Sequence, residues 1–320
     1  MRMRKVLVAA HGHCFDGLAS AVAFTHLRSH LDPRPVQFRY RSCGYGPTMQ
    51  TVPETWLSCD ENAIVDFRYT PSDRVTWYFD HHVTAFASDA ERETAHAEGR
   101  RCFFDPAYGS CTKLIADVGR ARFGVGFDAF AELVDWADKI DTARFASAAE
   151  AIDRTDPVMQ LGAVIEQHGN VELYSMLVPL LLERPPAEVG RDGAVQALWA
   201  PLAQAHRACL ARMQARAERR GEVVFVDLNE AVLETSGKFL AYSLVPDARY
   251  SVSLVRMKQH FKVSVGYNPW CGRARAHDIA ALCRRYGGGG HAVVGAVSVA
   301  IDDLAGAQRI ASELVSELNR

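Results

Sequence analysis

The tripeptide Asp80-His81-His82 is the part of the sequence whose residue types point most directly to chemistry. It follows the apolar run from Trp77 to Phe79, which has the composition of a buried strand. Two adjacent imidazoles beside a carboxylate are hard to explain by packing, because the chain has only 12 histidines. Imidazole nitrogen and carboxylate oxygen are common ligands of divalent metal ions. The tripeptide therefore favours a functional site at the end of this strand.

A second polar cluster directly follows the apolar run 6–10. His11, His13, Cys14 and Asp16 place two imidazoles, a thiol and a carboxylate within six positions. A loop at the end of a strand can direct several side chains to one point, which suits a metal ion. Histidine and aspartate are also ordinary loop residues, so the cluster by itself leaves a purely structural role open.

Three further carboxylates end apolar segments. Asp66 follows the apolar residues 63–65, although an aspartate in this position can also cap a turn. Asp138 and Asp141 lie three residues apart near the end of an amphipathic helical segment, where they share one face. A carboxylate at a helix C-terminus opposes the helix dipole, and either a metal ion or Lys139 would compensate it.

The elements that position these residues follow from the hydrophobic pattern. We expect a helix at 16–30 and strands that end in polar residues at 5–10, 36–40, 63–67 and 75–79. Short strands with intervening helices predict an α/β fold with a doubly wound, mostly parallel sheet. Ligands bind such sheets at the carboxyl ends of the strands, which is where the polar clusters lie.

The second half of the chain has a different pattern. The segment 109–183 is expected to be mostly helical, and a break at Glu183-Arg-Pro-Pro precedes a long helix at 187–219. Beyond it, strands and one helix predict a smaller mixed α/β domain, with the strands at 223–226, 250–255, 261–265 and 292–300 and the helix at 276–285. We therefore divide the chain into a first domain at 1–185, a helical connector at 186–220 and a second domain at 221–320.

Composition narrows the classes of partner. Hydrophobic residues make up 48% of the 320 residues, and the formal net charge of −2 provides no global basic field for a long nucleic acid. Small phosphorylated substrates fit this charge balance better. The first apolar run is too short for a signal peptide or a membrane span, and the eight cysteines form no Cys-x-x-Cys pair. We expect a cytoplasmic protein without a membrane partner.

Taken in order, these motifs resemble the DHH phosphoesterase superfamily with its DHH-associated C-terminal domain. The residues that carry the resemblance are Asp16-Gly17, Asp66, Asp80-His81-His82, Ile140-Asp141-Thr142 and Gly287-Gly288-Gly289-Gly290-His291. The resemblance spans nearly the whole chain. Within the superfamily, the chain is similar to oligoribonuclease/pAp phosphatase-like proteins. It implies hydrolysis of a phosphoester bond in a nucleotide or short single-stranded oligonucleotide through a metal-activated water, by a monomer or a homodimer.

The resemblance also implies a role for each cluster. One or two divalent ions are expected, with Mn(II) first and Zn(II), Co(II) or Mg(II) as alternatives. Asp66 would bridge two ions, one held also by Asp16, His81 and Asp141 and the other by His11. His82 would contact the substrate phosphate or donate a proton, and Asp80 would orient the imidazoles.

The glycine run is expected to bind substrate. Gly288, Gly289 and Gly290 would let backbone amides approach a phosphate, and His291 would donate a hydrogen bond to it. Relatives often have an arginine soon after the serine of the preceding strand, which this chain lacks. Arg273, Arg275 and Lys258 are the candidates for that contact, and its absence is the remaining alternative.

The chain departs from the family pattern at Cys14, where many members have an aspartate. A thiolate there would favour softer ions such as Zn(II), His13 could serve as a ligand instead, and an inert, packed thiol is the third possibility. Asp138 is a further possible ligand. Alternative functions are hydrolysis of pyrophosphate or polyphosphate and nucleotide binding by a regulatory protein with an impaired metal centre.

The start of the helix after Gly109 has two interpretations. Ser110 is expected to be its N-cap, because serine accepts hydrogen bonds from the free amides of the first turn. The amides at this helix start could alternatively receive a substrate oxygen.

Overall fold

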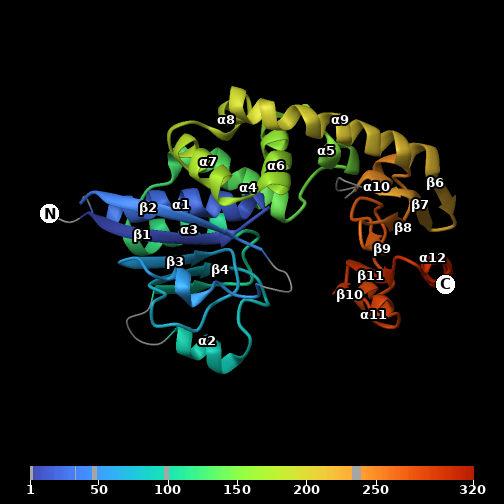
Figure 1. Cartoon of the computed structure of the whole chain (residues 1–320), viewed down its shortest axis with the longest axis horizontal. Helices are drawn as coiled ribbons and strands as arrows, with labels where there is room; N and C mark the ends of the chain where they lie inside the picture. Colours follow the sequence, from blue (N-terminus) through green and yellow to red (C-terminus); the bar gives the residue numbers. More distant parts are fainter. Residues whose placement is uncertain (1–2, 33, 45–48, 97–100, 233–238) are drawn as a thin grey trace. The chain divides into compact units, whose positions relative to one another are not determined.

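A computed structural model describes residues 3–32, 34–44, 49–96, 101–232 and 239–320. The chain forms two compact units, one made of residues 1–144 and 154–199 and the other of residues 145–153 and 200–320 (Figure 1). Each unit contains a β-sheet with helices, so the predicted α/β class is confirmed. Within the described part of the chain, no helix is both long and apolar enough to cross a membrane.

The sheet of the first unit has five parallel strands. In chain order they are β1 (Arg4–His11), β2 (Val36–Cys43), β3 (Glu61–Val65), β4 (Trp77–Asp80) and β5 (Arg101–Phe104). Their spatial order is β2-β1-β3-β4-β5, with every neighbouring pair parallel. The strand order therefore reverses between β1 and β3, which is the switch point where open parallel sheets bind ligands.

Helix α1 (Phe15–Leu31) is the central helix of this unit. It packs against β1 and against α3 (Cys111–Phe123), α4 (Ala131–Asp141) and α7 (Val171–Glu183). Because neighbours surround it, nearly all of its residues up to Arg28 are buried, and its apolar residues do not form a single stripe. The remaining helices of the unit are α2 (Asp89–Ala95), α6 (Pro157–His168), α8 (Pro186–Gly190) and the short 3₁₀ turns η1 (Glu54–Trp56) and η2 (Asp128–Phe130).

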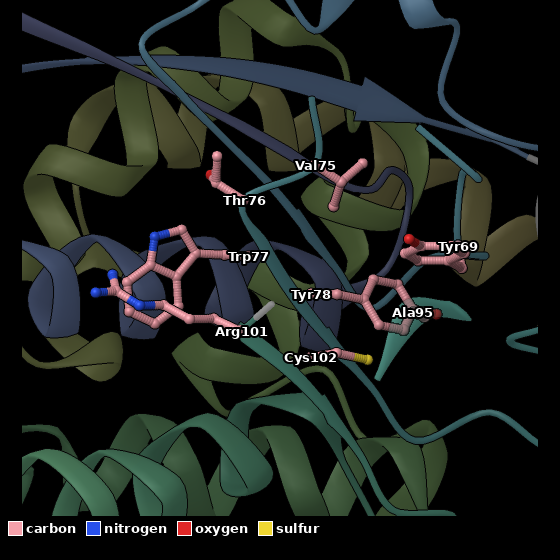
Figure 2. Close-up of a pocket in the computed structure, with 8 residues that line it drawn as sticks. All are labelled: Tyr69, Val75, Thr76, Trp77, Tyr78, Ala95, Arg101 and Cys102. Carbon is pink, nitrogen blue, oxygen red and sulfur yellow. The ribbon is translucent and has the colours of Figure 1, made fainter. Parts of the chain in front are cut away.

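A core cluster of this unit includes Leu7 and Tyr78, together with the buried Leu57 and Tyr69 of the segments between strands. A cavity of about 10 Å³ lies near this cluster (Figure 2). Figure 2 shows the guanidinium of Arg101 beside the ring of Trp77, 4.2 Å from its centroid. The volume has room for about one water molecule, so this cavity is not a ligand site.

The second unit contains a mixed sheet of six strands in the order β10-β11-β9-β8-β7-β6. The strands are β6 (Ala217–Arg220), β7 (Val223–Val232), β8 (Tyr250–Arg256), β9 (His260–Tyr267), β10 (Gly289–His291) and β11 (Val294–Ala300). The helices are α5 (Ala148–Ile152), α10 (Leu240–Leu244), α11 (Ile279–Arg284), α12 (Leu304–Leu318) and the end of α9 (Gly193–Arg216). Apolar residues of α11 and α12 share a core with β7, β8 and β9.

Three elements differ from the sequence-based expectations. Strand β5 was not predicted, because its apolar run, Cys102–Phe104, has only three residues. The single helix expected at 187–219 is divided between α8 and α9, of which α9 ends at Arg216, and the next residues pair with β7 as strand β6. A strand was expected only from 292 onward, but Gly289–His291 at the end of the glycine run form strand β10 and pair with β11.

A buried ion pair joins α1 to β3. Nε and Nη2 of Arg28 donate to the two carboxylate oxygens of Glu61 at 2.8 and 2.6 Å, and Nε1 of Trp77 donates to the same carboxylate at 3.0 Å. Arg28 and Glu61 are only 3% and 9% exposed, so water cannot replace either partner. The pair therefore fixes α1 relative to the strand that leads to Asp66.

Replacing Glu61 with alanine should destabilise the first unit strongly. The change leaves a buried guanidinium without its main partner, for which a loss of about 3–5 kcal/mol in unfolding free energy is expected. Urea denaturation measures this loss. Asp89→Ala is the matched control, because its pair with Arg92 is exposed to solvent and should be worth at most about 1 kcal/mol. Equal effects of the two substitutions would contradict the prediction.

Candidate metal centre

Side chains from three neighbouring strand ends and two helices meet at the carboxyl edge of the first sheet. His11 ends β1, Asp66 follows β3, and His81 and His82 follow β4. The parallel register aligns these ends, since Ala10 pairs with Val65 and Val65 with Phe79. Three overlapping groups of ligand atoms result, in each of which the atoms lie within 4.8 Å of one another: His11, Cys14 and Asp66; Asp66, His81 and His82; and Asp16, His81 and Asp141.

Asp66 lies at the centre of this cluster and belongs to two of the groups. Its backbone is left-handed, with φ 55°, a conformation that aspartate tolerates better than most residues. Both carboxylate oxygens are buried, and neither has a hydrogen-bond partner among the described residues. A buried carboxylate without hydrogen bonds is costly unless a cation compensates it. The imidazoles of His81 and His82, 3.5 and 3.7 Å from Oδ1, can supply that charge when they are protonated, and a metal ion can supply it when they are not, so this side chain fits a metal ligand.

His81 has the orientation that is usual for a metal-binding histidine. Its Nδ1 lies 3.1 Å from the carbonyl oxygen of Tyr108, which leaves Nε2 to face the carboxylates. Nε2 is 3.5 Å from Asp66 Oδ1 and 3.5 Å from Asp141 Oδ2, and 3.8 Å from Asp16 Oδ2. These distances are long for hydrogen bonds. They suit atoms around a shared ion, because two ligands each about 2.1 Å from a metal lie roughly 3.0–3.5 Å apart.

The charges of the cluster shift the pKa values of its members. Burial alone would raise the pKa of Asp66, but the neighbouring His11 and His81 outweigh this effect and lower it to about 2. Burial would lower the pKa of His81, yet Asp66 and Asp16 outweigh it and raise that pKa to about 10. Burial and the charges of Asp66 and Asp141 raise the pKa of Asp16. Without a metal, the cluster therefore holds protons that a bound cation would displace.

Asp80 holds His82 in place. One of its oxygens accepts hydrogen bonds from the amides of His81 and His82 at 2.8 and 3.2 Å and lies 2.8 Å from His82 Nδ1. The other accepts from the hydroxyl of Tyr78 at 2.9 Å. Burial would lower the pKa of His82, but Asp80 and Asp66 raise it to about 9. With Nδ1 directed to Asp80, the remaining nitrogen, Nε2, is left for another partner.

Helix α3 holds the carboxylate of Asp16. The amides of Cys111 and Thr112 donate to its two oxygens at 2.7 and 3.0 Å, and the hydroxyl of Thr112 donates at 2.6 Å. The amide of Lys113 instead donates to the side chain of Ser110, which confirms the predicted N-cap. The first amides of this helix therefore bind a carboxylate of the same chain, not a substrate oxygen.

Of the three possible further metal ligands, Cys14, His13 and Asp138, only Cys14 belongs to a ligand group among the described residues. Cys14 lies in a ligand group with His11 and Asp66, and burial, followed by the charges of Asp66 and Asp16, raises the pKa of its thiol well above the usual value. His13 and Asp138 belong to none of the ligand groups found among the described residues. His13 is exposed, with Nδ1 3.0 Å from the Glu166 carbonyl.

A cavity of about 480 Å³ lies near the cluster. Tyr108 and Gly109 line it, and the carbonyl of Tyr108 contacts His81. A side chain at Gly109 would approach the carboxylate of Asp138, which lines the same cavity and pairs with Arg144. The other lining residues are Ala107, Lys113, Asp117 and Thr142.

Two tyrosines that sequence reasoning did not identify support the cluster. The hydroxyl of Tyr78 donates to Asp80, and that of Tyr174 donates to the backbone carbonyl of His11 at 2.5 Å. Tyr78 is within a strand and Tyr174 is 163 positions from His11, so no local motif marks either contact.

The substrate-binding residues predicted in the second unit have local partners there. Gly288 and Gly290 are required by close packing, because a Cβ at either position would overlap a backbone carbonyl of β11. His291 is exposed at the end of β10. Arg273 pairs with Glu222, and Arg275 donates to the carbonyl of His277 at 2.6 Å. Their proposed roles toward a substrate stay predictions.

The sequence matches no protein-family model and no curated protein. Solved structures are similar over nearly the whole chain. One is a pGpG-specific phosphodiesterase, PggH, from Vibrio cholerae, at 20% identity and a TM-score of 0.70 over 99% of each chain. Another is a DHH domain described as a member of a family of ribosomal proteins, with 14% identity and a TM-score of 0.66 over 99% of this chain and 88% of its own.

A third similar structure is the exonuclease RecJ bound to manganese, at 15% identity and a TM-score of 0.58 over 98% of this chain and 90% of its own. At these identities the likeness concerns the fold. The chain therefore has the DHH-type fold that its motifs predicted.

If Cys14 is a metal ligand, cadmium should reveal it. Bound Cd²⁺ deprotonates a coordinating thiol and produces a charge-transfer band in the ultraviolet. We expect wild-type protein to show this band and Cys14→Ser to lose it, with a larger loss of affinity for Zn²⁺ than for Mn²⁺. Cys59→Ser, which changes another partly exposed cysteine, is the control. A band that persists in Cys14→Ser would remove this thiol from the site.

Proposed function

We propose that the chain is a metal-dependent phosphoesterase that hydrolyses a phosphoester bond in a nucleotide or a short oligonucleotide. The observation that carries this proposal is Asp66, whose two buried oxygens have no hydrogen-bond partner among the described residues and belong to two ligand groups. The names of two proteins with the same fold, a pGpG-specific phosphodiesterase and an exonuclease, support the substrate class.

The ligand groups suggest how metal ions would be held. Asp66 would be shared between two sites, with His11 and Cys14 completing one and His81, Asp16 and Asp141 contributing to the other. The carboxylates and imidazoles suit Mn(II), whereas the thiol shifts the first site toward Zn(II). Bound divalent ions supply an activated water and neutralise charge on the phosphoryl oxygens.

The chain's own residues would orient the substrate. Asp80 fixes Nδ1 of His82, so Nε2 is the nitrogen that can donate a proton or a hydrogen bond to a phosphate oxygen. In the metal-free protein, the hydrogen bond and charge of Asp80 and the charge of Asp66 raise the pKa of His82 to about 9. His82 is therefore our candidate catalytic residue, and Asp80 positions it.

The cavity beside the cluster would receive the nucleoside bonded to the phosphate. Its volume of about 480 Å³ is within the usual range for small-molecule sites. Tyr108 offers a ring for stacking. Lys113 and Asp117 pair with each other at 2.9 Å, and the ammonium of Lys113 has further protons to donate to polar groups of a base or ribose.

Asp66→Asn should abolish turnover with Mn²⁺. Replacing a residue that only supports a metal ligand often lowers metal affinity or activity 10–100-fold. Loss of a ligand shared by two ions should therefore lower the turnover rate by more than about 100-fold. The panel is bis-p-nitrophenyl phosphate, pAp, linear and cyclic dinucleotides, short oligonucleotides and polyphosphate. Asp89→Asn, on exposed helix α2, is the control and should keep full activity.

The panel also decides between the alternatives. Cleavage of polyphosphate alone would replace the phosphoesterase with a phosphoanhydride hydrolase. If no substrate is turned over with Mn²⁺, Co²⁺, Mg²⁺ or Zn²⁺, the proposed enzymatic activity would be refuted, and a nucleotide-binding protein would be favoured.

Affinity for Mn²⁺ should rise with pH. His81, with a pKa of about 10, is protonated at neutral pH in the metal-free protein, and an ion that binds its Nε2 must displace that proton. As pH rises from 6 to 8 this competition weakens, by up to about tenfold in affinity per pH unit for each proton released. Calorimetric titrations in buffers of different ionisation enthalpy measure both the affinity and the proton count. A pH-independent affinity without proton release would contradict the pKa shifts.

A further inference from the structure

Thr112 stands out because its buried hydroxyl contacts a carboxylate of the cluster. It is fully buried in the first turn of α3, and its hydroxyl donates to Asp16 Oδ1 at 2.6 Å, the shortest of the three hydrogen bonds to that carboxylate. The other two donors are backbone amides, which no side chain replacement removes. The hydroxyl is therefore the one contact to this carboxylate that depends on the side chain at position 112.

The two carboxylate oxygens of Asp16 have different hydrogen-bond partners. Oδ1 accepts both the amide and the hydroxyl of Thr112, whereas Oδ2 accepts only the amide of Cys111 among the hydrogen bonds described. Oδ2 is also the oxygen that faces His81 Nε2, at 3.8 Å. Thr112 thus occupies one oxygen and leaves the other directed into the ligand group of Asp16, His81 and Asp141.

A second buried hydroxyl contacts that of Thr112. Ser20 Oγ of α1 lies 3.1 Å from Thr112 Oγ1. A hydroxyl has a single proton, and that of Thr112 is directed to Asp16, so Ser20 must be the donor in the contact between them. The result is a chain from Ser20 to Thr112 to Asp16, in which each member is buried.

We propose that Thr112 is a positioning residue of the metal centre: its hydroxyl holds Asp16 in the orientation that presents Oδ2 to the ion. This inference rests on the proposed function. Partners of metal ligands orient them and reduce the cost of bringing carboxylates together, and replacing such partners typically weakens metal binding 10–100-fold. Because Thr112 is fully buried and contacts the carboxylate of Asp16, it should act on metal affinity and not on turnover of the fully loaded protein.

The test compares three variants by calorimetric titration with Mn²⁺. Thr112→Val keeps the shape of the side chain but removes the hydroxyl, and its affinity should fall roughly 10–100-fold. Thr112→Ser keeps the hydroxyl and should bind Mn²⁺ close to wild type. Ser20→Ala removes the neighbouring buried hydroxyl without touching the carboxylate and should also remain close to wild type. Saturating Mn²⁺ should restore turnover of Thr112→Val.

Several outcomes would overturn the inference. One is wild-type affinity in a folded Thr112→Val, and another is an equal loss in Thr112→Val and Ser20→Ala, which would indicate a packing effect. Thermal unfolding of the metal-free variants checks folding, and Thr112→Ala takes the place of Thr112→Val if the latter does not fold. Failure of wild-type protein to bind any of Mn²⁺, Co²⁺, Mg²⁺ and Zn²⁺ would instead refute the proposed function, on which the role of Thr112 depends.

Discussion

Repulsion among the carboxylates at the carboxyl edge of the first sheet is the constraint on which the rest of the site depends. Asp16, Asp66 and Asp141 all approach Nε2 of His81, and each would repel the others if His81 carried no charge. Burial strengthens this repulsion, because little water is present to screen it. The fold therefore has to hold together groups that separate spontaneously in an unfolded chain.

Rigid elements provide the restraint. The switch point between β1 and β3 brings two strand ends together, and α3 directs its first amides at Asp16, where the helix dipole favours a negative charge. Asp80 is tied to the backbone of the two residues that follow it. Such preorganisation keeps the candidate ligand atoms close to the geometry that an ion would require, and a bound ion would in turn remove the repulsion.

The same constraint explains the unusual backbone of Asp66. A continued strand would direct this side chain to one face of the sheet, whereas the left-handed conformation turns the chain immediately after Val65. The cost of this conformation is offset by the amide of Asp66, which donates to the carbonyl of Phe79 at 2.9 Å on the neighbouring strand end. Strain of this kind is often found at functional sites.

Local signals in the sequence determined a good part of this protein. The buried strands β1, β3 and β4 contain continuous apolar runs, and a polar residue of the cluster follows each run. The apolar runs predicted the sheet. The position of His11, Asp66 and His81 directly after these runs made them candidate site residues. Strand β5 escaped prediction because it is short and half-exposed, and its pairing with β4 depends on residues more than twenty positions away.

Only the tertiary structure decided which neighbours these residues have. In sequence, His13 and Cys14 were equivalent candidates, but the turn before α1 leaves His13 exposed and directs Cys14 toward Asp66. Thr112 and Tyr174 reach the cluster from positions far along the chain, where nothing local distinguishes them from ordinary core residues. The physical reason is that residue type and spacing specify periodic elements and chemical capacity, whereas hydrogen-bond partners depend on how those elements pack.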